Sequence, residues 1–340
     1  MSATLPHAHG GPPATAVLRA QAADFRVDEI LGFEPSGAGE HAFVLVEKTD
    51  ANTEWVARQL ADATGVAPLA VGFAGLKDRH AVTRQAFTVQ LPGRADPDWQ
   101  ALAIDGVRVL SATRHDRKLK RGAHRGNRFR IRLREVRGER VAIEARLDAI
   151  RARGVPNYFG EQRFGRDGRN IALAESLFAG RRMPRAQRGF ALSAARSEIF
   201  NTLLATRVAD ASWDRALEGE VCMLDGSHAV FGPEPIDSEL AGRLAAFDIH
   251  PTGPMWGAGE LRSMALVRQL ELAAAAANEG LARGLERAGL SQERRALRLR
   301  VAGMQHEWEA VDCLVLEFQL AAGAFATAVL RELCGWNAPA

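Results

Sequence analysis

One acidic residue, Asp78, stands between cations in the segment of residues 75–85, GLKDRHAVTRQ. The segment opens on a glycine and leads into the alternating run Phe87, Val89 and Leu91, a pattern typical of a strand. Neighbouring cations keep a carboxylate ionised, and an ionised carboxylate can act as a nucleophile or a base. The segment therefore predicts a reactive carboxylate, although the pattern alone also fits a surface ion pair at a turn.

The direct partner of Asp78 is not expected among its sequence neighbours. In an extended backbone, Lys77 and Arg79 point to the face opposite Asp78, so they raise the local positive potential without pairing with it. A cation from another strand must supply the ion pair. Arg19, beside the first predicted strand, is the candidate.

A second feature is the basic segment 114–140, in which twelve residues are Lys or Arg and three are Asp or Glu. Its second half alternates strictly, so in a strand Asn127, Phe129, Ile131 and Leu133 share one face and the arginines share the other. A solvated strand face would give the same pattern. The basic loop that precedes it favours contact with phosphates.

Three aromatic residues, Phe25, Phe129 and Phe325, have apolar neighbours and by default pack in a core. However, Phe129 shares a strand face with Asn127, and Phe325 opens a predicted helix after Gly323. A ring and an amide together can stack on a nucleobase and hydrogen-bond to its edge, and a helix N-terminus can hold a phosphate.

Composition and missing motifs restrict the remaining classes of function. A chain of 340 residues predicts two domains, and a net charge of +3 favours anionic partners. The three cysteines are far apart, and the histidines lack metal-ligand spacing, so we expect neither disulfides nor a metal. The sequence also lacks nucleotide-binding glycine motifs and a nucleophile-elbow serine, which predicts a protein without a cofactor. It lacks a signal peptide and an apolar membrane span, which predicts a cytoplasmic protein.

Periodicity predicts the elements that carry these residues. Strands are expected at 16–19, 25–30, 41–47, 71–75, 127–134 and 312–320. Helices are expected from a cap at Asn52 or Thr53, at 141–153 with Val141 facing inward, and at 171–178, 193–208, 238–247, 260–288 and 325–333. Gly154 and Pro156 mark a domain boundary.

Several of these stretches, in order along the chain, resemble the TruD family of tRNA pseudouridine synthases. The matching pieces are DFRV at 24–27 with LGF at 31–33, GLKDRHAVT at 75–83, RGNRF at 125–129, VPNYFG at 155–160, QRFG at 162–165, LSAARS at 192–197, and GAFAT at 323–327 with LREL at 330–333. The resemblance implies an α+β, V-shaped, two-domain molecule. Its catalytic domain, with a mixed and mainly antiparallel sheet, would take residues 16–153 and 301–340. An inserted α/β TRUD domain would take 154–300, after a flexible tail at 1–15.

The resemblance also implies an activity, the conversion of uridine-13 in the D-arm of tRNA to pseudouridine, with the target base flipped out. Asp78 matches the catalytic aspartate, and the substrate-binding positions match Phe25, Asn127, Phe129, Phe325 and, less closely, Arg19. We expect the RNA contacts to include Lys77, Arg79, His80, Lys118, Lys120, Arg121 and Arg125. The expected partner is tRNA, with no membrane or metal, and the expected form is a monomer. A non-catalytic RNA-binding protein on the same scaffold is the alternative, and an RNA methyltransferase is a weaker one.

Overall fold

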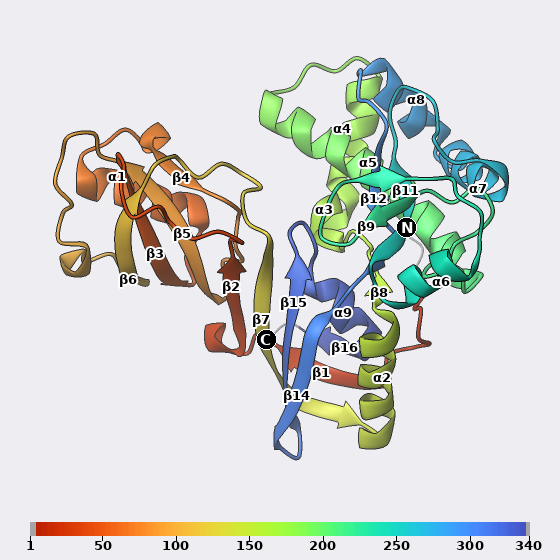
Figure 1. The fold of residues 1–340 in the computed structure, drawn as a ribbon, viewed down its shortest axis with the longest axis horizontal. Coiled ribbons are helices and arrows are strands. Elements are labelled where there is room, and N and C mark those ends of the chain that lie inside the picture. Colours follow the sequence, from red (N-terminus) through yellow and green to blue (C-terminus); the bar gives the residue numbers. More distant parts are fainter. Residues whose placement is uncertain (1–4, 338–340) are drawn as a thin grey trace. The chain divides into compact units, whose positions relative to one another are not determined.

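The computed structural model describes residues 5–337, and the chain forms two compact units (Figure 1). The sheet unit contains residues 14–140, 301–323 and 334–337, and the helical unit contains residues 5–13, 141–300 and 324–333. Both units therefore join segments that are far apart in the sequence. Helices and a mixed sheet make the fold α+β, as predicted. Relative to the expected domain limits, residues 5–13, 141–153 and 324–333 group with the helical unit.

One large, twisted sheet is the frame of the sheet unit. Its strands follow the order β14-β15-β7-β2-β5-β3-β6, with β1 paired to β7 and β16, and with β4 paired to β5. Among the strand pairs of this sheet within residues 5–337, β1–β16 and β2–β5 are parallel and the others are antiparallel. The bounds are β1 Ala14–Leu18, β2 Phe25–Ile30, β3 His41–Thr49, β4 Val71–Phe73, β5 Val82–Gln90, β6 Val107–His115, β7 Gly126–Gly138, β14 Ala302–Ala310, β15 Cys313–Ala321 and β16 Cys334–Asn337.

Strand β7 occupies a central place between β15 and β2, and it has the predicted alternation. Asn127, Phe129, Ile131 and Leu133 are all buried, whereas Arg128 and Arg130 are exposed. Phe129 lies opposite Val27 of β2 and Phe318 of β15. The apolar face of β7 therefore fixes the register of both neighbouring strands, because a slip of one residue would expose it.

Helix α1 (Thr53–Thr64) supplies the apolar cover of one part of the sheet. Val56 and Leu60 are fully buried in a cluster with Val44 of β3 and Phe87 of β5. The expected side-chain cap is not formed: Asn52 takes the N-cap position without a cap hydrogen bond. The hydroxyl of Thr53 instead donates to the Gln85 side chain. The start of α1 is therefore tied to β5.

The helical unit surrounds a four-stranded sheet of order β10-β9-β11-β12, and it also contains the two-stranded pair β13–β8. Its helices are α2 Arg140–Arg153, which begins at the last residue of the sheet unit, α3 Glu161–Phe164, α4 Arg169–Phe178, α5 Arg185–Ala209, α6 Ser238–Ala245, α7 Ala265–Ala276, α8 Glu279–Arg287 and α9 Ala326–Leu333. Its strands are β8 Val155–Pro156, β9 Cys222–Leu224, β10 Val230–Phe231, β11 Ile249–Met255, β12 Glu293–Ala296 and β13 Arg298–Leu299.

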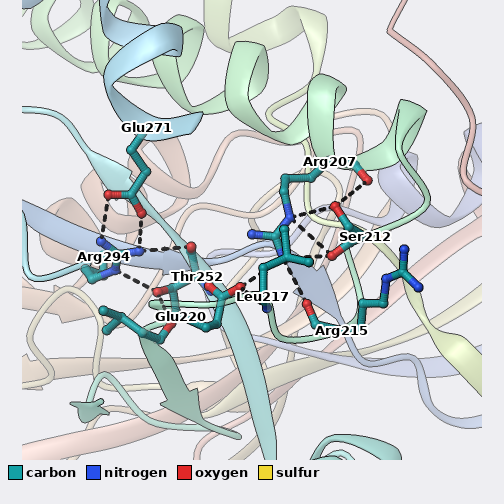
Figure 2. A network of polar contacts seen from close by, with 9 residues as sticks. Arg207, Ser212, Arg215, Leu217, Glu220, Thr252, Glu271 and Arg294 are labelled. Atoms are coloured by element: carbon teal, nitrogen blue, oxygen red, sulfur yellow. Dashed lines mark hydrogen bonds and ion pairs between the residues drawn. The ribbon is translucent and has the colours of Figure 1, made fainter. Parts of the chain in front are cut away.

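A buried polar network links α5, α7, β11 and β12 inside the helical unit (Figure 2). The Arg207 side chain is fully buried and donates to Glu220, at 2.9 Å, and to the backbone oxygen of Ser212. Nearby, Arg294 donates to Glu271 at 2.6 Å. Buried ions lose their hydration, so each charge depends on its partner. The network fixes the helices against the small sheet.

Two predictions about helices need correction. Val141 is 79% exposed. The buried stripe of α2 is Ile143, Leu147 and Ile150, and a residue two places before that stripe faces away from it. The expected helix at 260–288 is two helices, α7 and α8. They part where Asn278 leaves the helical conformation and donates to the carbonyl of Ala274.

The N-terminal segment also differs from the expected flexible tail. Leu5 and Ala8 pack against the core of the helical unit, and the backbone N–H groups of Ala8 and His9 donate to Glu332 at 3.0 and 3.3 Å. A Pro/Gly-rich pattern does not predict that Leu5 and Ala8 pack on a core, or that the distant Glu332 accepts hydrogen bonds from the backbone. Residues 5–13 are therefore packed, and the first strand begins at Ala14.

Candidate active site

Asp78 lies on the loop between the antiparallel strands β4 and β5, with its side chain about one-third exposed. The loop has few backbone bonds of its own, and buried side chains hold it instead. Lys48 of β3 donates to the carbonyl of Asp78 at 2.8 Å and to that of Ala51 at 2.7 Å. The Thr53 hydroxyl accepts from the N–H of Lys77, and Gln85 donates to the carbonyl of Gly75. These contacts give the Asp78 backbone a fixed position.

The expected ion pair of Asp78 is present. Arg19 Nη2 donates to Asp78 Oδ1 at 2.9 Å, with the two side chains 23% and 34% exposed. Arg19 follows β1 with a φ of 60°, a left-handed backbone conformation that costs a non-glycine residue about 1–2 kcal/mol. The ion pair and a cation–π contact with Phe25, at 4.0 Å, offset that cost. Such strain is typical of sites where a side chain must be aimed at one point.

The predicted aromatic residues of the sheet unit form one chain of contacts that begins at this ion pair. Phe25 packs edge to face on Phe129 with ring centroids 6.2 Å apart, and Phe129 stacks on Phe318 at 5.4 Å. Phe25 and Phe129 are 1% and 5% exposed, so their faces are occupied in this structure. A base could stack on Phe25 only after the Arg19 guanidinium moved off the ring.

Asn127 lies two residues from Phe129 on the same face of β7 and opposite Glu29 of β2. It is 8% exposed, and its Oδ1 atom has no hydrogen-bond partner among residues 5–337. An unpaired buried acceptor costs about 1–3 kcal/mol, so an incoming donor would gain that energy. The N3–H group of a uracil is a donor of this kind.

Phe325 belongs to the helical unit, just before α9. It packs, partly buried, against the cluster that includes Tyr158 and Phe159. The structure thus brings together Arg19, Phe25, Asp78 and Phe129, with Asn127 on the same strand face as Phe129. The role of Phe325 toward a substrate stays a prediction.

Lys77 is a correction among the residues expected to contact RNA. Its ammonium group donates to Glu29 at 2.7 Å, and the two side chains are 3% and 2% exposed. Glu29 also accepts from the backbone N–H of Ala86. Lys77 therefore fastens the loop to β2 and β5, and its charge is not available to a phosphate.

The arginine face of β7 is a second correction. Arg130 pairs with Glu317 and Glu309, Arg132 pairs with Glu309 and Asp24, and Arg134 makes two bonds to Asp24. Carboxylates from β14, β15 and the turn before β2 thus neutralise most of the stripe. Burial raises the pKa of Asp24, but Arg134 and Arg132 lower it further, so the pKa lies below its usual range. The ion pairs of this arginine face therefore mainly hold β7 to its neighbouring elements.

The other expected RNA contacts are at the surface or near it. Arg79 lines a hollow of about 380 Å³ with Trp55 and Arg58, and His80 is exposed beside Asp50. Lys118 donates to the carbonyl of Leu69, and Arg121 pairs with Glu54 at 3.1 Å. Lys120 and Arg125 are exposed and have no ion pair with any residue the structure describes. These two cations are free to meet a phosphate.

Sequence reasoning missed Lys48, the residue that holds the Asp78 backbone. Lys48 is fully buried on β3 within a run of strand residues. The available signal was its place in the strand alternation, because Lys48 continues the face of Ala42, Val44 and Val46. Burial lowers its pKa to about 8, with the charge of Asp78 opposing that fall and the charge of Lys77 adding to it.

Lys48→Met should change the pH dependence of stability. Between pH ~8 and ~10.5 the unfolded chain holds a proton on Lys48 that the folded chain has lost, so unfolding free energy should rise with pH in that window. The variant should lack this contribution. The measurement is urea unfolding of both proteins at pH ~7 and ~9.5. Parallel pH profiles for the two proteins would contradict the assignment.

Comparison with known proteins decides the family. The profile of tRNA pseudouridine synthase D (TruD) matches residues 6–180 and 172–333. The chain is 52% identical to the tRNA pseudouridine synthase D of Xanthomonas euvesicatoria pv. vesicatoria, over 97% of this chain and 94% of that protein. The chain belongs to the TruD family. Its identity to the tRNA pseudouridine synthase D of Methylococcus capsulatus is 51%, with the same coverage of 97% and 94%.

The fold agrees with this TruD membership. A solved chain from Methanosarcina mazei, described as a candidate TruD, superposes with a TM-score of 0.73 over 96% of this chain and 95% of that one. At 21% identity that likeness is one of fold. Within residues 5–337, no helix is long and apolar enough to cross a membrane. No cluster of His, Cys, Asp and Glu side chains within the same range could hold a metal ion.

Proposed function

We propose that this TruD family member converts uridine-13 in the D-arm of tRNA to pseudouridine, with Asp78 as the nucleophile or base. Family membership supports the reaction class, since the relatives are named tRNA pseudouridine synthase D. The observation that carries the residue assignment is the Asp78 carboxylate, paired with Arg19 at 2.9 Å on a loop fixed by buried side chains. The proposed setting is the cytoplasm, and the proposed working form is a monomer.

The chemistry needs one carboxylate. The N-glycosidic bond between C1′ and N1 breaks, the uracil turns, and C1′ bonds to C5, whose hydrogen leaves to water as a proton while N1 takes up a proton. No electrons are gained or lost. Asp78 would begin the reaction by attacking C1′ or C6, or by removing the C2′ proton to give a glycal. Hydrolysing glycosidases use a second carboxylate to activate water. Here water competes with the uracil for C1′, so apolar residues around the site favour the isomerisation by excluding water.

Neighbouring residues supply these apolar surroundings and orient the base. Arg19 pairs with Asp78 and covers the Phe25 ring. An entering uracil would take the place of the guanidinium on that ring, while its N3–H donates to the unpaired Oδ1 of Asn127. Flipping the base costs a few kcal/mol, which phosphate contacts elsewhere must offset. Movement of Arg19 would then couple substrate entry to exposure of the carboxylate.

Lys120→Gln with Arg125→Gln should weaken tRNA binding and lower its salt dependence, because both cations are exposed and without ion pairs to the described residues. Each lost phosphate contact should reduce the slope of log Kd against log salt by about one. The matched control is Arg108→Gln with Arg130→Gln, whose side chains are exposed but paired with Glu47 and Glu317. Equal effects of the two pairs on binding and slope would reject the proposed surface.

The reaction itself can be tested with a tRNA transcript that carries tritium at C5 of uridine. Pseudouridine formation releases this label to water, so the purified protein should release up to one equivalent per tRNA. A transcript with cytidine at position 13 is the control, and it should release none. Binding of the tRNA without release of tritium would contradict an enzyme and support a non-catalytic RNA-binding protein.

A further inference from the structure

A group of unpaired arginines lies far from Asp78 in the sequence, at the loop between α4 and α5 and the first turns of α5. Residues 176–197 contain no Asp or Glu. Arg181, Arg182, Arg185 and Arg188 are all exposed, and none has an ion pair or side-chain hydrogen bond to a residue in the described range 5–337. This differs from β7, where carboxylates neutralise the arginines. The positive charge here is free to meet an external anion.

The same face of α5 also has a hollow and an aromatic ring. Arg163, Arg185, Ala186, Gly189, Phe190 and Ser193 line an open hollow of about 660 Å³. Phe190 is 62% exposed, a large apolar surface for a helix whose other side is buried. Gly189 also lines this hollow, and no atom outside its own stretch of helix lies within 4 Å of where a Cβ would stand, so this part of the hollow is open.

Arg163 gives the hollow a fixed cation. Its Nη1 donates to the Ser193 hydroxyl at 2.6 Å, and its guanidinium lies 5.1 Å from the centre of the Phe159 ring. The planar guanidinium is thus oriented, and the exposed Arg185 lines the same hollow. Single-stranded nucleic acids bind to surfaces of this kind. Their phosphates contact the arginines, and an unstacked base stacks on the exposed ring.

We propose that this face, the α5 patch (Arg163, Arg181, Arg182, Arg185, Arg188 and Phe190), is an RNA-binding surface of the helical unit. It holds the phosphate backbone of the tRNA, and Phe190 stacks on an unpaired base. This inference deepens the proposed function, on which it rests, by naming where the helical unit contacts the substrate. An acidic protein would satisfy the arginines, but it would not need a ring beside an open hollow.

Charge removal is the first test. Arg182→Gln, Arg185→Gln and Arg188→Gln together should raise the Kd for unmodified tRNA by about tenfold or more at ~0.15 M salt, and lower the salt slope by up to about three. The matched control changes three exposed arginines of α7 and α8, Arg268→Gln, Arg283→Gln and Arg287→Gln. The control variant removes the same net charge but lies outside the α5 patch. The salt slope of tRNA binding should therefore stay at the wild-type value.

Phe190 gives an independent test. Phe190→Ala should weaken tRNA binding by about 5- to 150-fold, as for the loss of one stacked base, with the salt slope unchanged. Phe190→Trp should restore binding. Wild-type affinity in the triple arginine variant and in Phe190→Ala would overturn the α5 patch. If the wild-type protein released no tritium from labelled tRNA, the proposed function would fail instead, and the affinities would still be measurable.

Discussion

Asp78→Asn should abolish pseudouridine formation, by on the order of 10⁴-fold or more, and leave tRNA affinity within a few fold. Asparagine has nearly the same shape, and its Oδ1 can still accept from Arg19, so the loop and the pocket should persist. What disappears is the negative charge that lets the carboxylate attack the substrate or remove its proton. Single-turnover formation of pseudouridine, measured at saturating enzyme, separates this loss from any change in binding.

Asp116→Asn is the matched control for that experiment. Asp116 is a 57% exposed carboxylate of the same unit, beside Arg117 and outside the Asp78 loop. Its substitution should leave the rate at the wild-type value. A rate for Asp78→Asn within tenfold of wild type would show that another group starts the reaction.

Arg207→Met should destabilise the helical unit by about 3–5 kcal/mol, because it leaves the buried carboxylate of Glu220 without its cation. Glu220 is almost fully buried, and desolvation raises its pKa above the usual range despite the opposing charge of Arg207. Hydrogen exchange should therefore speed up in α5 and β11, which the network joins, and around Glu220 (Figure 2). Exchange followed by mass spectrometry localises the effect to this unit.

Two further variants separate the unpaired charge from the lost packing. Arg207→Met with Glu220→Leu removes both ions, and it should recover a large part of the lost protection. Arg283→Met breaks the exposed pair with Glu279 on α8 and should change exchange little. If the double variant were less stable than Arg207→Met alone, the buried charge would not be the cause.

Local patterns predicted the frame of the site well. Strand β2 has the predicted bounds, Phe25–Ile30, and the alternating face of β7 is buried as expected. The ion pair of Asp78 with Arg19 was also predicted, because side chains of adjacent residues in an extended chain point to opposite faces. These features depend on the two-residue period of a strand, which can be read directly from the order of apolar and polar residues in the sequence.

Long-range partners were the part that could not be predicted. Glu309 and Glu317 lie 177 or more residues from the arginines that they neutralise. No local pattern reports such a pairing, so the β7 stripe was mistaken for a phosphate-binding face. Lys48 was missed for a similar reason: its role depends on a loop that follows it by 30 residues. The strands β9, β10, β12 and β13 have two to four residues each, and such short strands give little periodic signal.

The central claim is tested most directly by mapping pseudouridine in a single unmodified tRNA transcript after incubation with the purified protein. The result we expect is one new pseudouridine, at position 13 of the D-arm, that is absent when Asp78→Asn replaces the wild-type protein. Pseudouridine at another position, or none from a folded protein that binds the transcript, would contradict the account.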